Sequence, residues 1–449
     1  MSQKIKPSLS KGTRDFLPRE VAKRNYIFET IKAVFRKYGF EQIETPAIER
    51  LETLTGKYGD EGDKLLFKIL NSGDYLKDVP DEVLTTHNSQ LATKHIAEKG
   101  LRYDLTVPLA RYVVQHKSEI TFPFKRFHIG PVWRADRPQK GRYQEFYQCD
   151  ADVIGSTSLW NEVELTQIFL EVYKALKIPV TILVNHRLYL QRIGDFVKQG
   201  AITAEIIAAF DKCDKIGIDG VLNELSKYGL SQEELNLLRN VLSGTINYLN
   251  IEIQESEEGK KAHNDLSKFF GQFTNESAVI FYPALARGLD YYTGIIWEVV
   301  CNGVQMGSIA SGGRYDNLTE MFGGQNLSGV GISFGIERIY DVMEELNLFP
   351  DTISQGVKIL FVPREPAVEE FTYTQVQTLR DAGIGAEIFL GNVKKQKQFD
   401  YATAKGILYI AEIGQDEVAS GVFRVKNIST REEIRQNIDE LLHLFISQQ

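Results

Sequence analysis

Cysteine is scarce in this 449-residue sequence. Only Cys149, Cys213 and Cys301 occur, far apart, with no Cys-x-x-Cys pair and no His-x-x-x-His cluster. Such a set supports neither a disulfide framework nor a zinc site. We therefore expect three reduced thiols and no zinc.

Long apolar stretches are also missing. No apolar run is long enough to cross a membrane, and the first residues, MSQKIKPSLSKGTRDFLP, contain no apolar core of a signal peptide. We expect a cytoplasmic protein without a membrane partner.

A surplus of positive charge is absent as well, because 52 Lys and Arg residues stand against 60 Asp and Glu residues, a formal net charge of -8. This excludes a general coat of nucleic-acid-binding charge, although a local basic cleft can still attract a polyanion. With 43% apolar and 25% charged residues, the composition is that of a globular protein with roughly two or three domains.

The N-terminal part predicts a long helix followed by an edge strand. Residues 20–38 have the spacing of an amphipathic helix, and Gly39 is placed to end it. The apolar stripe of this helix consists of Ile27, Ile31, Val34 and Phe35. The extended segment EQIETPAIE follows, and Pro46 limits it to a sheet edge or to an interface strand. A subunit contact could be built from these two elements.

Period-two patterns then predict an antiparallel sheet. The stretches LRYDLTVP (101–108), FPFKRFHIGPVWRAD (122–136) and QEFYQCDADVIG (144–155) are β-like, and the loop RPQKGR joins the last two. Adjacent strands with a tight loop pair antiparallel, unlike the βαβ alternation of a nucleotide-binding parallel sheet.

The rest of the chain predicts three further regions, which are helical, then mainly β, then mixed α/β. Residues 195–275 have helical spacing and predict an inserted helical domain. β-like sequence resumes in AVIFYPALARGLDYYTGIIWEVV and GSIASGGRYDNL, and SGVGISFGIERIYDVMEEL predicts a strand that becomes a helix at Gly335, with Ile336, Ile339, Tyr340 and Met343 buried. Short strand runs separated by helical segments then predict a C-terminal α/β domain.

One predicted strand has a polar face. Along QEFYQCDADV, Phe146, Gln148, Asp150 and Asp152 share one side of the pleat. This side could simply face solvent. The preceding strand makes a binding surface the better interpretation, because its alternate residues Arg126, His128, Val132 and Arg134 project to one face and three of them are basic.

A cluster of cations surrounds the short loop between these two strands: Arg134, Arg137, Lys140 and Arg142. Guanidinium groups bind phosphate oxygens bidentately, so the cluster suits a polyphosphate or a nucleic-acid end. Arg338 adds a cation in the first turn of the later helix, where the helix N-terminus also favours an anion. No P-loop occurs, and GVGISFG misses the dinucleotide-binding spacing by one residue.

These motifs together resemble the class II aminoacyl-tRNA synthetases. FHIGPVWRADRPQKGRYQEFYQCD is similar to their second motif, GVGISFGIER to their third, and ETPAIE to their proline-containing first. ARGLDYYTG and SGGRYDNL resemble the two histidine-specific motifs of the histidyl-tRNA synthetase family, and KGTRDFLP its N-terminal signature. The resemblance extends from Lys11 to about Val425.

The resemblance implies an α+β fold, in which helices flank a six-stranded antiparallel sheet of the class II synthetase type. It implies a catalytic domain over residues 1–350, a helical insertion over 195–275 and a C-terminal α/β anticodon-binding domain over 356–449. The segment VKKQKQFDYATAKG follows the family's anticodon domain only loosely, so the anticodon contacts stay unassigned. The family is dimeric, which implies a homodimer.

For ATP, the resemblance implies that Arg134 holds the α-phosphate and Arg338 the γ-phosphate, while Phe146 stacks under adenine with Arg338 opposite. Magnesium would be bound together with the ATP. The neighbouring loop residues Asp136, Arg137, Lys140 and Arg142 would contact ATP or the acceptor end of the tRNA.

For histidine, Asp104 and Thr106 match positions that hold the ammonium group, and Gln148 matches one that contacts ammonium and carboxylate. Asp152 and Tyr292 match the pair that brackets the imidazole. The pocket would also include Tyr291 and Tyr315, and Arg287 would lie between the substrate carboxylate and the α-phosphate. Many bacterial members have Glu where this chain has Asp104 and Asp152, so each carboxylate is one methylene shorter.

The implied activity is a histidine–tRNA ligase, which activates L-histidine with ATP and transfers it to the 3′ end of tRNA(His). The alternative is a regulatory protein on the same fold, such as the synthetase-like subunit of ATP phosphoribosyltransferase. That relative lacks the histidine-specific motif and the anticodon domain. Because Arg287, Tyr291 and Tyr292 are present and a C-terminal domain follows, the sequence favours the enzyme.

Overall fold

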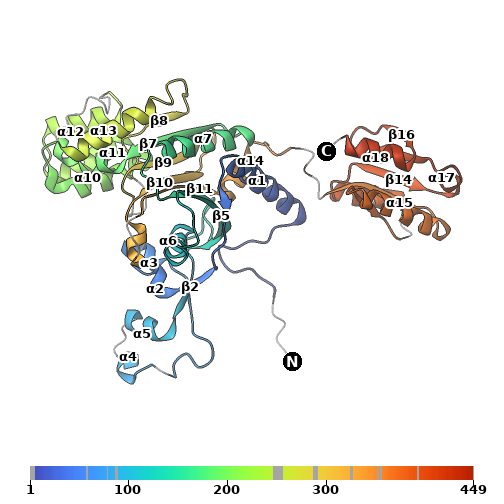
Figure 1. The fold of residues 1–449 in the computed structure, drawn as a ribbon, viewed down its shortest axis with the longest axis horizontal. Coiled ribbons are helices and arrows are strands. Elements are labelled where there is room, and N and C mark those ends of the chain that lie inside the picture. Colours follow the sequence, from blue (N-terminus) through green and yellow to red (C-terminus); the bar gives the residue numbers. More distant parts are fainter. Residues whose placement is uncertain are drawn as a thin grey trace. The chain divides into compact units, whose positions relative to one another are not determined.

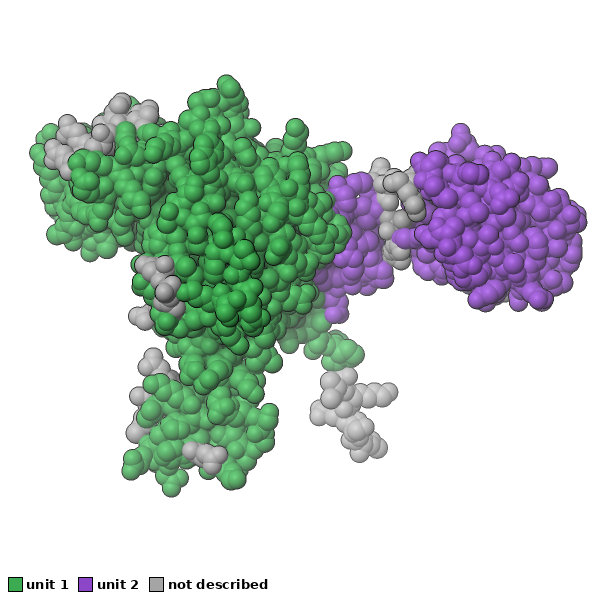
Figure 2. All heavy atoms as spheres, in the orientation of Figure 1, with its two compact units in different colours: residues 1–14, 27–348 green, residues 15–26, 349–449 purple. Residues whose placement is uncertain are grey.

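The computed structural model describes residues 6–56, 59–77, 79–85, 89–245, 256–286, 292–323, 327–350, 353, 356–391 and 394–447. The chain forms two compact units (Figure 2), one of residues 1–14 and 27–348, the other of residues 15–26 and 349–449.

The larger unit is built on an eight-stranded sheet with the order β1-β5-β6-β11-β10-β9-β7-β8. Its strands are β1 (Glu41–Gln42), β5 (Phe124–Trp133), β6 (Glu145–Ile154), β7 (Val180–His186), β8 (Val279–Phe281), β9 (Ile295–Cys301), β10 (Ala310–Tyr315) and β11 (Gly329–Gly335). The six strands from β5 to β7 pair antiparallel throughout, which confirms the predicted sheet. The short β1 and β8 extend its two edges in parallel.

Helices cover one face of this sheet (Figure 1). In α1 (Pro18–Lys37) the buried residues are the predicted Ile27, Ile31, Val34 and Phe35. The Phe35 ring lies 5.4 Å from Phe127 on β5 and 5.9 Å from Phe334 on β11. Phe169 of α7 (Trp160–Ala175) lies 5.2 Å from the same Phe334. Phe127 and Phe334 alternate with the polar side chains of their strands, so the opposite face remains available for a site.

The strand-to-helix transition at Gly335 is also confirmed. Helix α14 (Ile336–Glu345) follows β11 directly, with Gly335 as its N-cap residue. The predicted residues Ile336, Ile339, Tyr340 and Met343 are buried. Arg338 is thereby placed in the first turn of a helix that starts at the edge of the polar face.

The extended assignment of LRYDLTVP is wrong. Only β4 (Lys99–Leu101) is a strand, and α6 (Thr106–Gln115) begins within the stretch. Asp104 Oδ1 accepts a hydrogen bond from the Val107 backbone N–H at 3.1 Å, and Pro108 lies in the first helical turn. Both residues are typical of helix starts, and this local chemistry outweighs the alternating pattern.

The prediction for Pro46 is confirmed, because β1 ends before it and β2 (Ile48–Arg50) begins after it, each at a sheet edge. β2 pairs with β4, which also pairs with β3 (Lys68–Ile69). The short helices of this region are α2 (Leu51–Leu54), α3 (Gly59–Lys64), α4 (Asp81–Thr85) and α5 (Ser89–Ile96).

The expected helices between residues 195 and 275 are present and gather at the β7 and β8 side of the sheet (Figure 1). In the described residues between these strands, the α-helices are α8 (Arg187–Gln191), α9 (Ile193–Phe196), α10 (Thr203–Phe210), α11 (Cys213–Leu225), α12 (Gln232–Leu242) and α13 (Glu257–Phe270). They share one buried cluster that includes Leu190, Phe210, Leu225 and Leu238.

The smaller unit contains a five-stranded sheet with the order β13-β12-β14-β15-β16. Its strands are β12 (Val357–Pro363), β13 (Gly385–Ile388), β14 (Tyr409–Ile413), β15 (Phe423–Asn427) and β16 (Glu433–Gln436). The helices are α15 (Glu369–Asp381), α16 (Lys395–Ala404), α17 (Gln415–Ser420) and α18 (Ile438–Ile446). Across the described part of both units, no helix has the length and apolarity needed to cross a membrane.

Candidate functional site

The polar face predicted for β6 continues onto its neighbours. Arg126 and His128 of β5 lie opposite Asp152 and Asp150, and Ser333 of β11 also lies opposite Asp150. Residues paired directly across strands project to the same side. The sheet therefore collects these side chains on one face.

Two glycines make room on this face. A Cβ atom on Gly331 would lie 1.9 Å from Asp152 Oδ1, and one on Gly313 would lie 2.6 Å from Cδ1 of Tyr292. No side chain fits at either distance, so both glycines are needed for the close approach. The glycine-rich motifs thus let the Asp152 carboxylate and the Tyr292 ring cross over adjacent strands.

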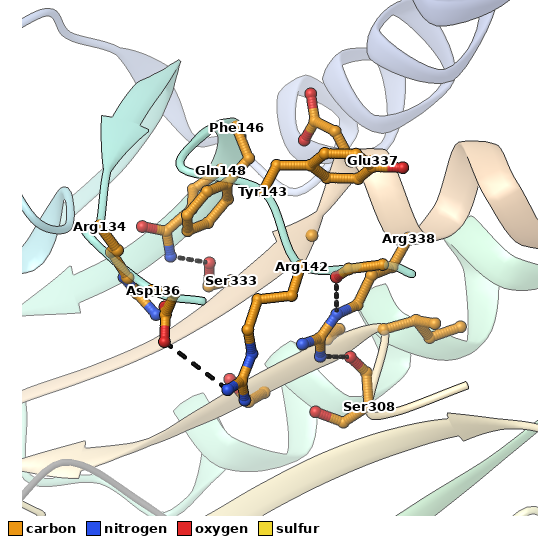
Figure 3. Close-up of a pocket in the computed structure, with 15 residues that line it drawn as sticks. Arg134, Asp136, Arg142, Tyr143, Phe146, Gln148, Ser308, Ser333, Glu337 and Arg338 are labelled. Carbon is orange, nitrogen blue, oxygen red and sulfur yellow. Dashed lines mark hydrogen bonds and ion pairs between the residues drawn. The ribbon is translucent and has the colours of Figure 1, made fainter. Parts of the chain in front are cut away.

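A pocket opens at the Phe146 end of β6 (Figure 3). Side chains of the β5–β6 loop (residues 134–144), of β6, of β11 and of α14 contribute to it. Predicted residues that line it are Arg134, Asp136, Arg142, Phe146, Gln148 and Arg338; Tyr143, Ser308, Ser311, Ser333 and Glu337 also line it and were not predicted. We name this region the cationic half of the site.

The three arginines are held in defined positions. Arg134 Nε donates to the Tyr103 carbonyl at 3.0 Å, and the guanidinium lies 4.3 Å from the Tyr103 ring and 5.2 Å from the Phe146 ring. Arg338 donates to the carbonyls of Gly141 at 2.8 Å and Ser308 at 2.5 Å. Arg142 pairs with Asp136 at 3.6 Å.

Two predicted loop cations do not line the pocket. Lys140 Nζ forms an ion pair with Glu345 Oε2 of α14 at 2.8 Å, and Arg137 is exposed. Their contact with ATP or tRNA remains a prediction.

The Asp152 end of β6 forms a closed acidic half. Asp152 Oδ2 pairs with Arg126 Nη2 at 2.6 Å, and the Tyr315 hydroxyl donates to Asp152 Oδ1 at 2.5 Å. Asp152, Arg126 and Tyr315 are all buried. Burial raises the pKa of Asp152, while Arg126 and the Tyr315 hydrogen bond oppose that rise. The two partners favour the ionised carboxylate that a hydrogen-bond acceptor requires.

Asp104 joins this half from the start of α6. Its side chain is buried, and its negative charge raises the pKa values of both Asp150 and Tyr292. The charge can act in this way only if the carboxylate lies close to both groups. Thr106, in the first turn of α6, is partly buried.

Arg126, His128 and Asp150 were missing from the predicted site residues. Burial, followed by the nearby Asp152, raises the pKa of Asp150 to about 7, with Arg126 opposing the shift. Burial and the charges of Arg126 and Arg102 lower the pKa of His128 to about 3, so this ring stays neutral near pH 7. Their alternation along the two strands had already placed these residues on the polar face, but the family resemblance assigned them no role.

Gln148 connects the two halves. It lines the pocket, and its Nε2 donates to Ser333 Oγ at 2.8 Å (Figure 3). Of the predicted histidine-binding residues that are described, Gln148 lines the pocket, whereas Asp152 and Tyr315 lie in the closed acidic half. Arg287 and Tyr291 lie outside the described residues.

The arrangement suits a substrate pair with opposite charges. An anion such as a triphosphate fits the cationic half, and the ammonium group of an amino acid fits the acidic half. Among the described residues, no set of three or more His, Cys, Asp or Glu side chains is grouped to hold a metal ion.

Comparison with known proteins gives matches along most of the chain. A family model described as histidyl-tRNA synthetase matches residues 12–76 and 92–339, and one described as anticodon binding domain matches residues 357–448. The histidine–tRNA ligase of Bacteroides fragilis is 48% identical over 446 residues, covering 97% of this chain and 98% of that protein. The histidine–tRNA ligase of Porphyromonas gingivalis is 49% identical over 437 residues, covering 95% of this chain and 96% of that protein.

Solved structures give the same comparison at the level of the fold. A histidyl-tRNA synthetase from a Nostoc species superposes with a TM-score of 0.83 at 28% identity, covering 99% of this chain and 100% of that one. A protein from Bacillus halodurans, described as ATP phosphoribosyltransferase regulatory subunit/histidyl-tRNA synthetase, gives a TM-score of 0.70 at 20% identity, covering 89% of this chain and 97% of that one. At that identity the likeness concerns the fold alone.

Proposed function

The chain belongs to the histidyl-tRNA synthetase family, and from this premise we propose that histidine and ATP meet on the polar face of β6. The enzyme activates L-histidine with ATP to histidyl-adenylate and transfers the histidyl group to tRNA(His). The observation that supports this location is the reversal of charge along one strand, with arginines around Phe146 and carboxylates around Asp152.

ATP occupies the cationic half in this proposal. Arg134 holds the α-phosphate, and Phe146 provides a stacking surface for adenine because its ring lines the pocket. Arg338 binds the γ-phosphate after its guanidinium leaves the carbonyls of Gly141 and Ser308. Asp136 and Arg142 contact the nucleotide from the loop. Magnesium enters as part of the ATP complex.

Histidine extends from Gln148 into the acidic half. Its ammonium group binds near Asp104 and Thr106, and its imidazole lies between Asp152 and Tyr292. Tyr315 acts on the imidazole through Asp152, to which its hydroxyl is hydrogen-bonded. The family pattern adds Tyr291 to this pocket and places Arg287 between the substrate carboxylate and the α-phosphate.

Neither step requires a nucleophilic side chain. A histidine carboxylate oxygen attacks the α-phosphorus of ATP and pyrophosphate leaves. A hydroxyl at the 3′ end of the tRNA then attacks the carbonyl carbon of the adenylate, and AMP leaves. The protein contributes position and charge neutralisation, because negative charge on the phosphoryl oxygens must be stabilised in a water-poor site.

Pyrophosphate exchange tests the proposal directly. With magnesium present, the purified protein should move label from pyrophosphate into ATP only when L-histidine is added. Absence of exchange in folded protein that still binds ATP would instead favour a regulatory protein on the same fold.

The division of labour between domains is a further part of the proposal. We place catalysis in residues 1–350, with the helical insertion 195–275, and anticodon binding in residues 356–449, which contain the separate five-stranded sheet. The cytoplasm, where tRNA and ATP are present, is the proposed location.

A homodimer is also proposed, and exposed apolar residues near β2–β4, such as Ile48, Leu70 and Leu76, are available for a subunit contact. Light scattering at the 51.0 kDa of one chain would contradict the dimer.

A further inference from the structure

The N-terminal segment around Gly12 and Arg14 is not used by the mechanism above, yet it contacts the β5–β6 loop directly. The Gln144 backbone N–H donates to the Gly12 carbonyl at 2.8 Å. Gly12 has φ +79°, and a Cβ atom there would lie 2.6 Å from Cγ of Gln144. Glycine is therefore needed at this position for two reasons: the backbone has a positive φ, and a side chain would collide with Gln144.

Gln144 is also hydrogen-bonded to residues that line the pocket. Its carbonyl accepts from the Arg134 backbone N–H at 3.0 Å, and its Nε2 donates to the Asp136 carbonyl at 3.0 Å. Gln144 therefore links the N-terminal segment to the backbone of Arg134 and Asp136, two residues that line the cationic half.

Arg14 makes the second connection. Its Nη1 donates to the Tyr143 hydroxyl at 3.0 Å, and the same nitrogen lies 3.5 Å from Asp341 Oδ1 on α14. The Tyr143 hydroxyl donates to Asp341 Oδ2 at 3.1 Å. The guanidinium carbon also lies 4.1 Å from the centre of the Tyr143 ring, within cation–π range. Three side chains from the N-terminal segment, the loop and α14 thus form one triangle.

Besides the exposed ion pair of Lys140 with Glu345, the loop is attached to α14 at two points, and the proposed complex retains only one of these two. The first is the bond from Arg338 to the Gly141 carbonyl, which in the proposed function Arg338 gives up to bind the γ-phosphate. The second is the triangle of Arg14, Tyr143 and Asp341, which offers no group to the nucleotide except the Tyr143 side chain that lines the pocket.

We propose that Arg14 is a positioning residue for ATP: through Tyr143 and Asp341 it holds the β5–β6 loop against α14 while Arg338 turns to the nucleotide. This inference rests on the proposed function. It predicts that loss of Arg14 weakens ATP binding through Asp136 and Arg142, and leaves the acidic half and its histidine affinity unchanged.

Steady-state pyrophosphate exchange with Arg14→Gln tests this inference. The KM for ATP should rise about tenfold, the change expected when a charge-assisted hydrogen bond is lost, while the KM for histidine stays within about twofold. Tyr143→Phe retains the ring and its packing but removes the hydroxyl, and it should also raise the KM for ATP while leaving the KM for histidine within about twofold. The double variant should be no worse than the more affected single variant, because both changes break one triangle.

Arg36→Gln is the matched control, since it removes the same charge from an exposed position on α1. It should leave both constants unchanged. Thermal unfolding by circular dichroism establishes that each variant is folded, and titration calorimetry measures ATP affinity without turnover.

An unchanged ATP affinity in folded Arg14→Gln and Tyr143→Phe would overturn the inference, as would equal increases in the KM values for ATP and histidine. Either result leaves the proposed function standing if the parent protein still shows histidine-dependent exchange. Failure of the parent to exchange would refute the proposed function instead.

Discussion

The two ends of β6 face the same side of the sheet and differ in both charge and openness. The cationic half around Phe146 is an open pocket, in which Arg134 and Arg338 donate to backbone carbonyls. The acidic half around Asp152 is closed, and its carboxylate is already bound by Arg126 and Tyr315. Carbonyls hold a guanidinium without cancelling its charge, whereas an ion pair largely does.

This difference indicates how each half is prepared for its ligand. The cationic half keeps its net positive charge and is ready for an anion. In the acidic half, burial disfavours ionised carboxylates, so Arg126 is needed to keep Asp152 charged. The buried Asp104 nearby then leaves the half acidic overall, as an ammonium group requires.

Breaking the acidic half should have the largest effect. Asp152→Ala leaves the imidazole without its acceptor, and sites built on such hydrogen bonds discriminate by factors of roughly 10⁴ or more. Histidine binding, measured by calorimetry, should fall by a factor of that order, while ATP binding changes little. Asp152→Glu, which retains a carboxylate, should lose much less. Equal losses of histidine and ATP affinity in a folded Asp152→Ala protein would show that the two halves are not separate.

The next largest effect is expected at Arg287, which we proposed to lie between the substrate carboxylate and the α-phosphate. Arg287→Lys keeps the charge but loses the planar guanidinium proposed to bridge carboxylate and α-phosphate. Loss of one preorganised donor costs about 2.7–4 kcal/mol, or 10²–10³ in rate. Stopped-flow adenylation should slow by that factor, with little change in the KM for ATP. A rate within about threefold of the parent would remove Arg287 from this role.

The acidic half should also shape the pH dependence of stability. With a folded pKa of about 7 against an ordinary value of 3.8, Asp150 keeps its proton in the folded state where the unfolded chain has lost it. Stability is therefore lost as pH rises from about 4 to about 7, and Asp150→Asn should remove this loss.

Urea unfolding at pH 4.5 and pH 8 measures this effect. The unfolding free energy of Asp150→Asn relative to the parent should increase between the two pH values by on the order of 2–3 kcal/mol. A constant difference at both pH values would mean that Asp150 ionises normally in the folded protein.

The smallest effect is expected in the open half. Arg142 is half-exposed and pairs with Asp136 at 3.6 Å, so water screens its charge. Arg142→Gln should raise the KM for ATP about threefold and leave the KM for histidine unchanged. An increase as large as that of an Arg134→Gln variant would show that the open half is as tightly organised as the closed one.

Several parts of the molecule were determined by the sequence alone. The apolar stripe of α1, the β5–β6 hairpin and the strand-to-helix transition at Gly335 were all predicted, because each is encoded by spacing within one continuous segment. The polar face of β6 followed from alternation, and the resemblance of its motifs indicated the family. A local rule also explains the error at LRYDLTVP, where Asp104 and Pro108 start a helix.

The tertiary structure decided which residues meet across long separations. Arg126 was visible as a member of the polar face, but its pairing with Asp152 depends on the register of β5 against β6. Asp104 acts on Asp150 from just before α6, and Arg14 reaches Tyr143 and Asp341 from the N-terminal segment. Periodicity is a property of neighbouring residues, whereas these contacts depend on how separate elements pack, and it is the packing that sets which charges are cancelled and which remain for a ligand.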